Sequence, residues 1–272
     1  MSGRVDLYDS HYASTGEDAY RQIRMETYGE DLGQTSWITA DEARRFFAWL
    51  AIPSHASMLE IACGSGGLSL LAARELGATV TGVDINEQAV RAAREVAGDT
   101  GGREGLPGRI SFQVQDASRP LPFDEEAFDI VFCNDSINHL PERSAVLRDW
   151  WRLLKPSGKI LYTDPIIATG ALSNHEIAVR SSIGFFLFMP PGENERLLEA
   201  CGFEILKVED VTQSTAEISL RWYESRRRRE QILVQVEGQE RYDGLQRFLE
   251  VVHRLASERR LSRFAFLAVK RP

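Results

Sequence analysis

A glycine loop with a glutamate in front of it is the part of the sequence best suited to hold a ligand. The loop, Glu60–Gly67, stands between an apolar run and a helical pattern, where glycines let a ligand approach the backbone closely. Glu60 precedes Gly64 by four residues and would repel the pyrophosphate that dinucleotide sites place at such a loop. Ser69 occupies the position of a dinucleotide loop's third glycine, and no lysine follows as in a phosphate-binding loop. The loop therefore favours a ligand with an ammonium group and no phosphate, and it disfavours a nicotinamide-dependent reductase.

Two more acids follow the next two apolar runs. Asp84 ends the second run, 18 residues beyond Gly66, close to the spacing of about 20 at which an acid binds the hydroxyls of a ribose. Asp116 and Ala117 follow the third run, where a side-chain oxygen could accept a hydrogen bond from the amino group of adenine. Each acid alone is as well explained by a helix cap or a surface charge. Three acids in register at successive strand ends indicate a nucleoside site.

The elements that must bring these acids together are the strands of a parallel sheet. From residue 57 onward, short apolar runs alternate with helical patterns, as in βαβ units. Because open α/β sheets bind ligands at the carboxyl ends of their strands, the acids should meet at one edge. The predicted strands cover residues 58–62, 79–84, 110–115, 127–133, 159–163, 203–211 and 264–269. The predicted helices cover residues 40–50, 67–76, 87–97, 143–154, 194–201 and most of 214–258.

Composition limits the class of protein. The 272 residues carry a net charge of −8, so a nucleic-acid partner is not expected. No apolar run is long enough to span a bilayer, and the N-terminus lacks a signal peptide's apolar region, so we expect a cytoplasmic protein without a membrane partner. The cysteines Cys63, Cys133 and Cys201 fit buried thiols better than disulfides or a metal site. The run Arg226–Arg229 has two interpretations, a solvated helix face, which we favour, and a phosphate or RNA contact.

Five segments resemble, in the expected order, the motifs of the class I S-adenosylmethionine-dependent methyltransferases of the small-molecule type. They are Leu59–Gly66, Val83–Asn86, Gln115–Ala117, Phe128–Asn134 and Leu153–Ile160. Two glycines usual in the family are replaced, by Ala62 and by Ser157. The resemblance covers roughly residues 57–164 and implies S-adenosyl-L-methionine as the cofactor. It implies an α/β fold, with a Rossmann-like, seven-stranded, mostly parallel sheet and helices on both faces.

The resemblance also suggests three parts of the chain. Residues 1–55 would form an N-terminal helical lid over the acceptor, and residues 56–164 the cofactor-binding core. Residues 165–272 would complete the sheet and add acceptor-cap and helical insertions near the C-terminus. The segment Tyr28–Thr39 is similar to the family's lid segment, in which an aromatic and a hydroxyl residue lie near the methionine carboxylate. This assigns Trp37 and Thr39 to the cofactor, with ordinary core packing as the alternative for Trp37.

Roles for single residues follow from the same resemblance. Glu60 would orient the amino-acid part of the cofactor, Asp84 would hold the ribose, and Ile85 would pack on the adenine. Asn134 would offer its backbone carbonyl to the cofactor ammonium. The implied cofactor-binding residues are Trp37, Thr39, Glu60, Ala62, Gly64, Gly66, Asp84, Ile85, Asp116, Ala117 and Asn134. No metal is expected.

The acceptor should lie beyond the fourth strand, at Ser136–Pro141. His139 is the candidate for proton removal because its ordinary pKa lies near 6.5. A hydrogen bond across the loop, or packing on the cofactor, is the alternative role. The apolar run Ile183–Met189 should cap the acceptor pocket or pack as core. The other candidates for the pocket are Tyr8, Tyr12, Tyr28, Asp164 and His11.

The function expected from these features is methyl transfer by in-line displacement to an oxygen, nitrogen or carbon atom of a small organic metabolite. The aromatic and apolar content of the two caps favours a small-molecule acceptor over a macromolecule. A different class of function is a cofactor-binding module that has lost catalysis and serves as a regulatory or partner subunit. The sequence indicates neither the acceptor nor the oligomeric state.

Overall fold

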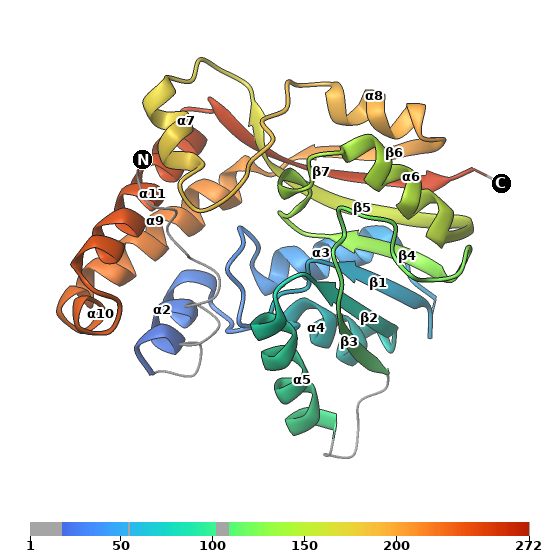
Figure 1. The fold of residues 1–272 in the computed structure, drawn as a ribbon, viewed down its shortest axis with the longest axis horizontal. Helices are drawn as coiled ribbons and strands as arrows, with labels where there is room; N and C mark the ends of the chain where they lie inside the picture. Colours follow the sequence, from blue (N-terminus) through green and yellow to red (C-terminus); the bar gives the residue numbers. More distant parts are fainter. Residues whose placement is uncertain (1–17, 54, 102–108, 272) are drawn as a thin grey trace.

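A sheet of seven strands forms the centre of the protein (Figure 1). The computed structural model describes residues 18–53, 55–101 and 109–271. The strands are β1 (Ser57–Ile61), β2 (Thr79–Asp84), β3 (Ile110–Val114), β4 (Phe128–Cys133), β5 (Leu154–Ala168), β6 (Phe203–Asp210) and β7 (Leu261–Lys270). They lie in the order β3-β2-β1-β4-β5-β7-β6. The first five are parallel and β7 is antiparallel to its two neighbours, so the predicted fold class is confirmed.

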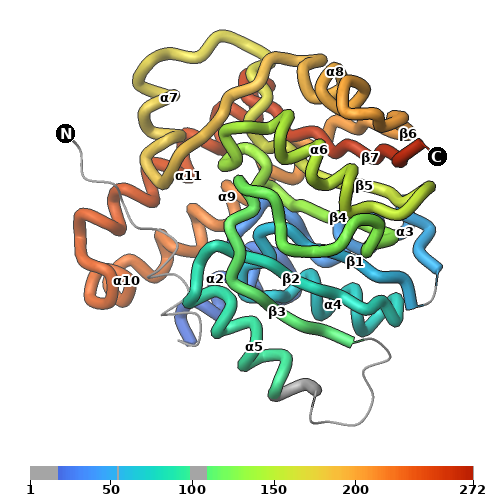
Figure 2. Tube along the Cα trace, turned by 45° about the vertical axis from the view of Figure 1, so that its right-hand side comes forward, coloured from blue at the N-terminus to red at the C-terminus, as the bar shows by residue number. Residues whose placement is uncertain are grey.

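Helices cover both faces of this sheet (Figure 2). They are α2 (Asp18–Tyr28), α3 (Ala40–Leu50), α4 (Gly67–Leu76), α5 (Glu87–Gly101), η1 (Ile137–His139), α6 (Arg143–Leu153), α7 (Asn174–Arg180), α8 (Glu193–Ala200), α9 (Thr212–Arg228), α10 (Glu230–Glu237) and α11 (Gln239–Ser257). Met58 and Phe132 face α3 and α4, whereas Leu59 and Val131 face α6 and α8. Because successive strand residues point to opposite faces, each apolar strand supplies both cores. None of the described helices has the length and apolar character needed to cross a membrane.

A separate helical layer combines a helix from the N-terminal part of the described chain with three helices from its C-terminal part. The helices α2, α9, α10 and α11 lie together beside the sheet (Figures 1 and 2) and share an apolar core. The ring of Trp37 lies 6.1 Å from that of Trp222 and 6.4 Å from that of Phe248, measured between centres. Aromatic rings from three distant segments therefore surround one another at the end of the sheet. That this layer acts as a lid stays a prediction.

The arginine run ties this helical layer together. Arg226 is 1% exposed and forms an ion pair with Glu237, which is also buried. Arg228 and Arg229 both bind Glu26 on α2, and their hydrogen bonds hold the pKa of Glu26 far below its usual value. The favoured interpretation as a solvated face is therefore wrong for Arg226 and Arg229. Protein carboxylates therefore pair with three of the four arginines, and Arg227 is exposed.

Most predicted elements lie within about two residues of their observed bounds, and β5 is the main exception. It begins at Leu154, directly after α6, and runs to Ala168, well beyond the predicted 159–163. The strand continues because Ile167 and Ala168 still pair with β7. The short helices α7 and η1 were not predicted, since too few residues lie in each to show a helical period.

Both positions at which the chain departs from the family's glycine pattern have a left-handed backbone. Ala62 has a φ of 54° and Ser157 a φ of 63°. A residue with a Cβ is strained by about 1–2 kcal/mol in this region because the Cβ crowds the following carbonyl oxygen. Ala62 and Ser157 therefore adopt a backbone conformation that is usual for glycine, and this conformation is strained for them.

Replacing Ser157 with glycine should raise the free energy of unfolding by about 0.5–1 kcal/mol, because the relieved strain exceeds the extra freedom of glycine in the unfolded chain. Urea unfolding would measure the change. Ser257→Gly is the matched control, since that exposed serine ends α11 and should lose stability when exchanged. A loss of stability in Ser157→Gly would contradict the argument.

Candidate active site

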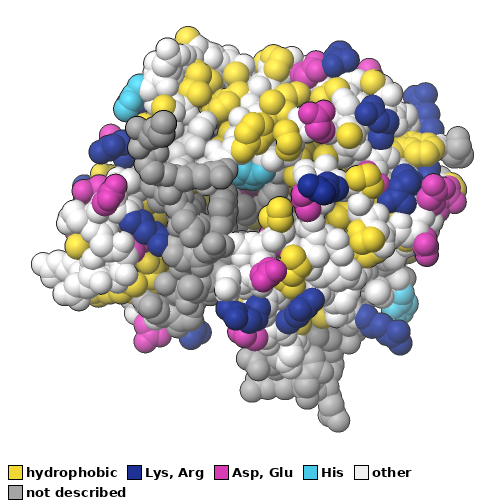
Figure 3. All heavy atoms as spheres, viewed as in Figure 1, with side chains coloured by type: hydrophobic (Ala, Val, Ile, Leu, Met, Phe, Trp, Pro, Cys, Tyr) yellow, Lys and Arg dark blue, Asp and Glu magenta, His cyan; other side chains and the backbone are white. Residues whose placement is uncertain are grey.

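A cavity of about 430 Å³ lies at the carboxyl ends of the parallel strands. The loops after β1, β2, β3 and β4 line it, and residues 32–37 lie across it. Trp222 of α9 and Phe248 of α11 also contribute to its wall. Figure 3 shows a hollow near the centre of one face of the molecule, with hydrophobic side chains gathered above it. The cavity thus combines the predicted strand-end site with side chains from the helical layer.

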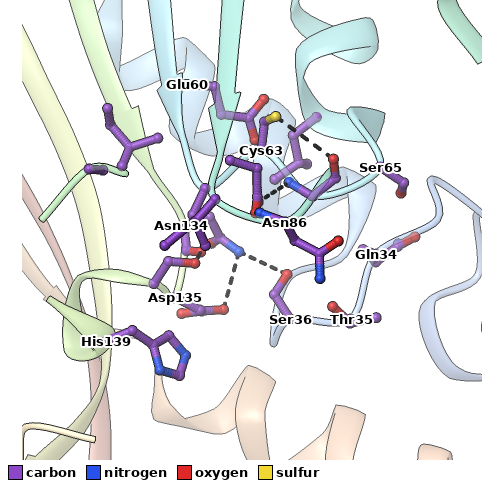
Figure 4. A pocket seen from close by; sticks show the side chains of 18 of the residues that line it. Gln34, Thr35, Ser36, Glu60, Cys63, Ser65, Asn86, Asn134, Asp135 and His139 are labelled. Atoms are coloured by element: carbon purple, nitrogen blue, oxygen red, sulfur yellow. Dashed lines mark hydrogen bonds between the residues drawn. The ribbon is translucent and has the colours of Figure 1, made fainter. Parts of the chain in front are cut away.

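Glu60 is buried at the end of β1 and lines this cavity (Figure 4). The hydroxyl of Ser69, on α4, donates a hydrogen bond to its carboxylate. Burial raises the pKa of Glu60 to about 8, and the charge of Asp84 adds to this, while the Ser69 hydrogen bond opposes it. The position that holds the third glycine of a dinucleotide loop therefore supplies the partner of this carboxylate.

The carboxylate of Asp84 is oriented by two backbone amides. The N–H of Gly64 donates to Oδ2 and the N–H of Asn86 donates to Oδ1, both at 2.9 Å. Each oxygen has a further lone pair for a ligand hydroxyl. Burial raises the pKa of Asp84. Beside it, Ile85 lines the cavity with 68% of its surface exposed, which leaves an apolar face open to a flat ring.

Asp116 and Ala117 line the cavity after β3. The hydroxyl and the backbone N–H of Ser118 donate to Oδ1 of Asp116, at 2.6 Å and 2.9 Å. These hydrogen bonds hold the pKa of Asp116 below its usual value, so the group is ionised at neutral pH. Asp116 therefore presents acceptor oxygens to the cavity.

Asn134 and Asp135 connect the loop after β4 to residues 32–37 (Figure 4). Nδ2 of Asn134 donates to the hydroxyl of Ser36 at 2.9 Å. The carboxylate of Asp135 accepts the backbone N–H of Trp37 at 2.8 Å. Asp135 has a φ of 53°, a left-handed conformation that aspartate adopts more readily than most residues. The strand-end loop thus fixes the segment that lies across the cavity.

A buried arginine supports this loop from β7. Arg263 is fully buried, and its Nε donates to Asp135 at 2.7 Å. Its Nη1 donates to Glu42, on α3, at 2.6 Å. One cation therefore lies between two carboxylates and links β7, α3 and the loop after β4.

His139 lines the cavity from η1. Its Nδ1 lies 2.8 Å from the carbonyl oxygen of Phe185. Because a carbonyl can only accept, Nδ1 carries the hydrogen and Nε2 keeps its lone pair. Burial lowers the pKa of His139, and the charge of Arg180 lowers it further. The imidazole is therefore neutral at pH 7 and able to accept a proton.

The segment that builds most of this site is similar to a known family. Residues 59–162, which carry the glycine loop and the strand-end acids, match the family model for a methyltransferase domain. The predicted resemblance to methyltransferases is thus confirmed for this segment, whereas the activity and the cofactor of the whole protein stay predictions.

Two relatives are similar to this chain in sequence. Methyltransferase GfsG of Streptomyces halstedii is 32% identical over 164 residues, which is 58% of this chain and 56% of that protein. The 27-O-demethylrifamycin SV methyltransferase of Amycolatopsis mediterranei (strain S699) is 28% identical over 212 residues, 74% of this chain and 76% of that protein. The chain thus spans little more than half of the first relative's length.

A solved structure shares the fold. Phosphoethanolamine N-methyltransferase 2 of Haemonchus contortus, solved with phosphomonomethylethanolamine and S-adenosylhomocysteine, has a TM-score of 0.80 at 24% identity. The match covers 97% of this chain and 60% of that one. It supports the arrangement of the sheet and helices.

Most residues predicted to bind the cofactor of the methyltransferase domain lie around one cavity. These are Trp37, Glu60, Ala62, Gly64, Asp84, Ile85, Asp116, Ala117 and Asn134, and His139 lies with them. Gly66 does not line the cavity; its φ is 79°, and a Cβ there would lie 2.5 Å from the ring of Phe112. Thr39 does not line it either, because its hydroxyl accepts the N–H of Glu42 at 3.2 Å and caps α3.

Two of the residues predicted for the acceptor pocket, Tyr28 and Asp164, are not among the residues that line the cavity. Tyr28 is buried in the helical layer, where its ring centre lies 6.2 Å from that of Trp222. Asp164 is fully buried and pairs with Arg143 at 2.5 Å. The structure therefore does not place these two side chains at the site. Tyr8, Tyr12 and His11 lie outside the described residues.

Several residues that line the cavity escaped the sequence analysis. The sequence does carry a signal for Asp135, since it lies in a polar group directly after β4. Arg180, Trp222 and Phe248 have none, because they come from helices far along the chain. Of the apolar run predicted as a cap or core, Ile183 and Phe186 line the cavity.

Proposed function

We propose that this protein transfers a methyl group from S-adenosylmethionine to an oxygen, nitrogen or carbon atom of a small organic acceptor. The observation that carries the proposal is the row of carboxylates of Glu60, Asp84 and Asp116 along the strand-end side of the cavity, whose described lining contains no lysine and one arginine, Arg180 of α7. Such a lining suits a cationic, phosphate-free ligand and opposes a nucleotide with phosphates.

The residues around the cavity fit the cofactor from end to end. Asp84 would hold the ribose through its free lone pairs, and Ile85 would pack on the adenine. Asp116 would accept a hydrogen bond from the adenine amino group. Glu60 and the backbone carbonyl of Asn134 would hold the amino-acid part.

When bound, S-adenosylmethionine supplies an electrophilic methyl group on a sulfonium, whose charge disappears in an in-line transfer. The chain's own contribution is to position the acceptor and to exclude water. Trp37, Phe186 and Phe248 provide an apolar wall for this purpose. His139 would hold the proton of an acceptor that must lose one.

The size of the cavity supports a small acceptor. Its volume of about 430 Å³ lies within the roughly 300–1,000 Å³ of ordinary small-molecule sites. Two relatives carry names that refer to small substrates, 27-O-demethylrifamycin SV and phosphoethanolamine. These names support the class of acceptor.

Calorimetry and a labelled donor test the proposal together. The full chain should bind S-adenosylhomocysteine and should transfer label from methyl-labelled S-adenosylmethionine to a compound in a metabolite extract. Binding without transfer would favour the regulatory module. Binding of NADH in place of S-adenosylhomocysteine would refute the proposal.

Asp84→Asn should weaken binding of S-adenosylhomocysteine by about 1–3 kcal/mol, because the new NH₂ group cannot accept hydrogen bonds from a ribose or from the backbone amides. Calorimetric titration would measure the loss. Glu87→Gln, an exposed exchange on the neighbouring α5, is the control and should bind as the parent does. Equal affinities of Asp84→Asn and the parent would contradict the ribose assignment.

His139→Ala should lower turnover by about 100-fold or more while leaving cofactor affinity unchanged, provided that the acceptor loses a proton. Since the pKa of His139 lies below its usual 6.5, the parent's rate should rise with pH below that value and then level. Rates measured against pH should show this rise in the parent and not in the variant. His175→Ala, on the exposed side of α7, is the control. If His139→Ala turned over as fast as the parent, His139 would have only a packing role.

A further inference from the structure

One wall of the cavity comes from outside the strand-end loops and is built from aromatic and apolar side chains. Its described members include Trp37, Ile183, Phe186, Trp222 and Phe248. The ring centre of Trp37 lies 6.1 Å from that of Trp222 and 6.4 Å from that of Phe248, so these rings form one continuous surface. Such a surface binds a ligand because apolar area is removed from water, and this attraction requires no charge on the ligand.

The cation on this wall is packed against the same rings. The guanidinium carbon of Arg180 lies 4.8 Å from the ring centre of Phe186 and 5.1 Å from that of Phe248. Arg180 is 2% exposed and has partners within the protein. Two of the rings that could bind a cationic acceptor are therefore already in contact with a cation of the protein itself. Since this arginine has its own partners, it does not require an anion from the acceptor.

The carboxylate that contacts this wall has its lone pairs filled. Oδ2 of Asp135 accepts the backbone N–H of Trp37 at 2.8 Å and Nδ2 of Asn134 at 3.2 Å. Its Oδ1 accepts Nε of Arg263 and the hydroxyl of Thr163, each at 2.7 Å. A carboxylate has about four lone-pair sites, so Asp135 has none left for an ammonium group of the acceptor. Its charge is paired with that of the buried Arg263.

The other carboxylates of the described lining lie on the strand-end loops. They are Glu60, Asp84 and Asp116, which the proposed function assigns to the cofactor. In the part of the lining that the structure describes, the aromatic wall therefore presents the acceptor with rings and not with an unpaired charge.

We propose that the acceptor is an uncharged molecule with an apolar or aromatic body, which lies against Trp37, Phe186 and Phe248. Contact with these rings selects it, since a charged group on the acceptor would lose its water without gaining an ionic partner on the wall. The inference rests on the proposed function, because it concerns the acceptor side of the same cavity.

Three phenols of similar size test the charge requirement without any variant. The full chain, saturated with S-adenosylhomocysteine, is titrated by calorimetry with 4-propylphenol, with tyramine, which has an ammonium group in place of the terminal methyl, and with 4-hydroxyphenylacetate, which has a carboxylate. We expect 4-propylphenol to bind about tenfold or more tightly than either charged analogue. 4-Ethylphenol should bind about fourfold more weakly than 4-propylphenol, because it buries one methylene less. Equal or tighter binding of a charged analogue, or no binding of 4-propylphenol, would overturn the inference.

Two neighbouring phenylalanines test whether the probe lies on this wall. Phe186→Ala should weaken binding of 4-propylphenol about fivefold or more, since it removes a ring from the wall. Phe185→Ala is the matched control and should bind like the parent, because Phe185 is 48% exposed and is not among the residues that line the cavity. Binding of S-adenosylhomocysteine by both variants shows that they are folded. Equal affinities of Phe186→Ala and the parent would overturn the inference, whereas a parent that fails to bind S-adenosylhomocysteine would refute the proposed function.

Discussion

Replacing Arg263 with methionine should lower the free energy of unfolding by about 3–5 kcal/mol, because two buried carboxylates lose the cation between them. Asp135 and Glu42 accept hydrogen bonds from this guanidinium at 2.7 Å and 2.6 Å. Methionine fills most of the volume but donates no hydrogen bond. Each carboxylate must then stay charged in a buried site without this guanidinium or take up a proton, and both alternatives cost free energy.

Urea unfolding would measure the loss for Arg263, and Arg259→Met supplies the matched control. Arg259 pairs with Asp210 at the surface, so its exchange should change stability by less than about 0.5–1 kcal/mol. Arg263→Lys keeps the charge and should lose less than Arg263→Met. A loss below about 1 kcal/mol in Arg263→Met would show that the carboxylates find other partners.

The same exchange should also weaken cofactor binding, since Asp135 holds the backbone N–H of Trp37 in place across the cavity. Calorimetry on the folded fraction of Arg263→Lys separates this effect from unfolding. An unchanged affinity would mean that residues 32–37 keep their position without the arginine.

The part of the site that follows the strand order could be predicted from the sequence. Glu60 and Asp84 end consecutive strands of a parallel sheet, so their proximity follows from the order of the elements. Even Ser69, which occupies the position of a dinucleotide loop's third glycine, lies at a predictable place in the first turn of α4. Local pattern is sufficient where neighbouring elements build the site.

The rest depends on contacts between distant parts of the chain. Arg263 lies 128 positions from Asp135 and 221 from Glu42, and nothing in its neighbourhood distinguishes it from a surface arginine. Arg180 likewise reaches the cavity only because α7 packs over it. Thr39 is different: it was assigned to the cofactor, although a threonine followed by Glu42 three residues later is a helix-start pattern that indicates a cap.

Glu60 should make the stability of the ligand-free protein fall as pH rises. Its pKa is about 8 in the folded protein against 4.5 for an unperturbed glutamate, so the folded state binds the proton more tightly. The resulting stabilisation is fully present below pH 4.5 and is lost as pH rises through about 8. A shift of this size corresponds to a loss on the order of 4 kcal/mol.

The difference in unfolding free energy between the parent and Glu60→Gln, measured from pH 5 to pH 9 with urea, isolates this group from the other titrating residues. Glutamine stays neutral, so the parent should become less stable relative to the variant as pH rises. Ser69→Ala is the companion variant; it removes the hydrogen bond that lowers the pKa of Glu60, so the loss should move to higher pH. A difference that is constant with pH would show that Glu60 is ionised throughout.

The affinity for the cofactor should change with pH in the opposite direction to stability and increase as pH rises. A ligand with an ammonium group favours the ionised form of Glu60, so binding of S-adenosylmethionine should release a proton below pH 8 and should tighten as pH rises toward that value. Calorimetry in buffers of different ionisation enthalpy counts the released proton. Glu60→Gln should release none at this site and should bind with an affinity that pH changes less. Equal proton release by both proteins would assign the proton to another group, and the carboxylate before the glycine loop would then only pack the fold.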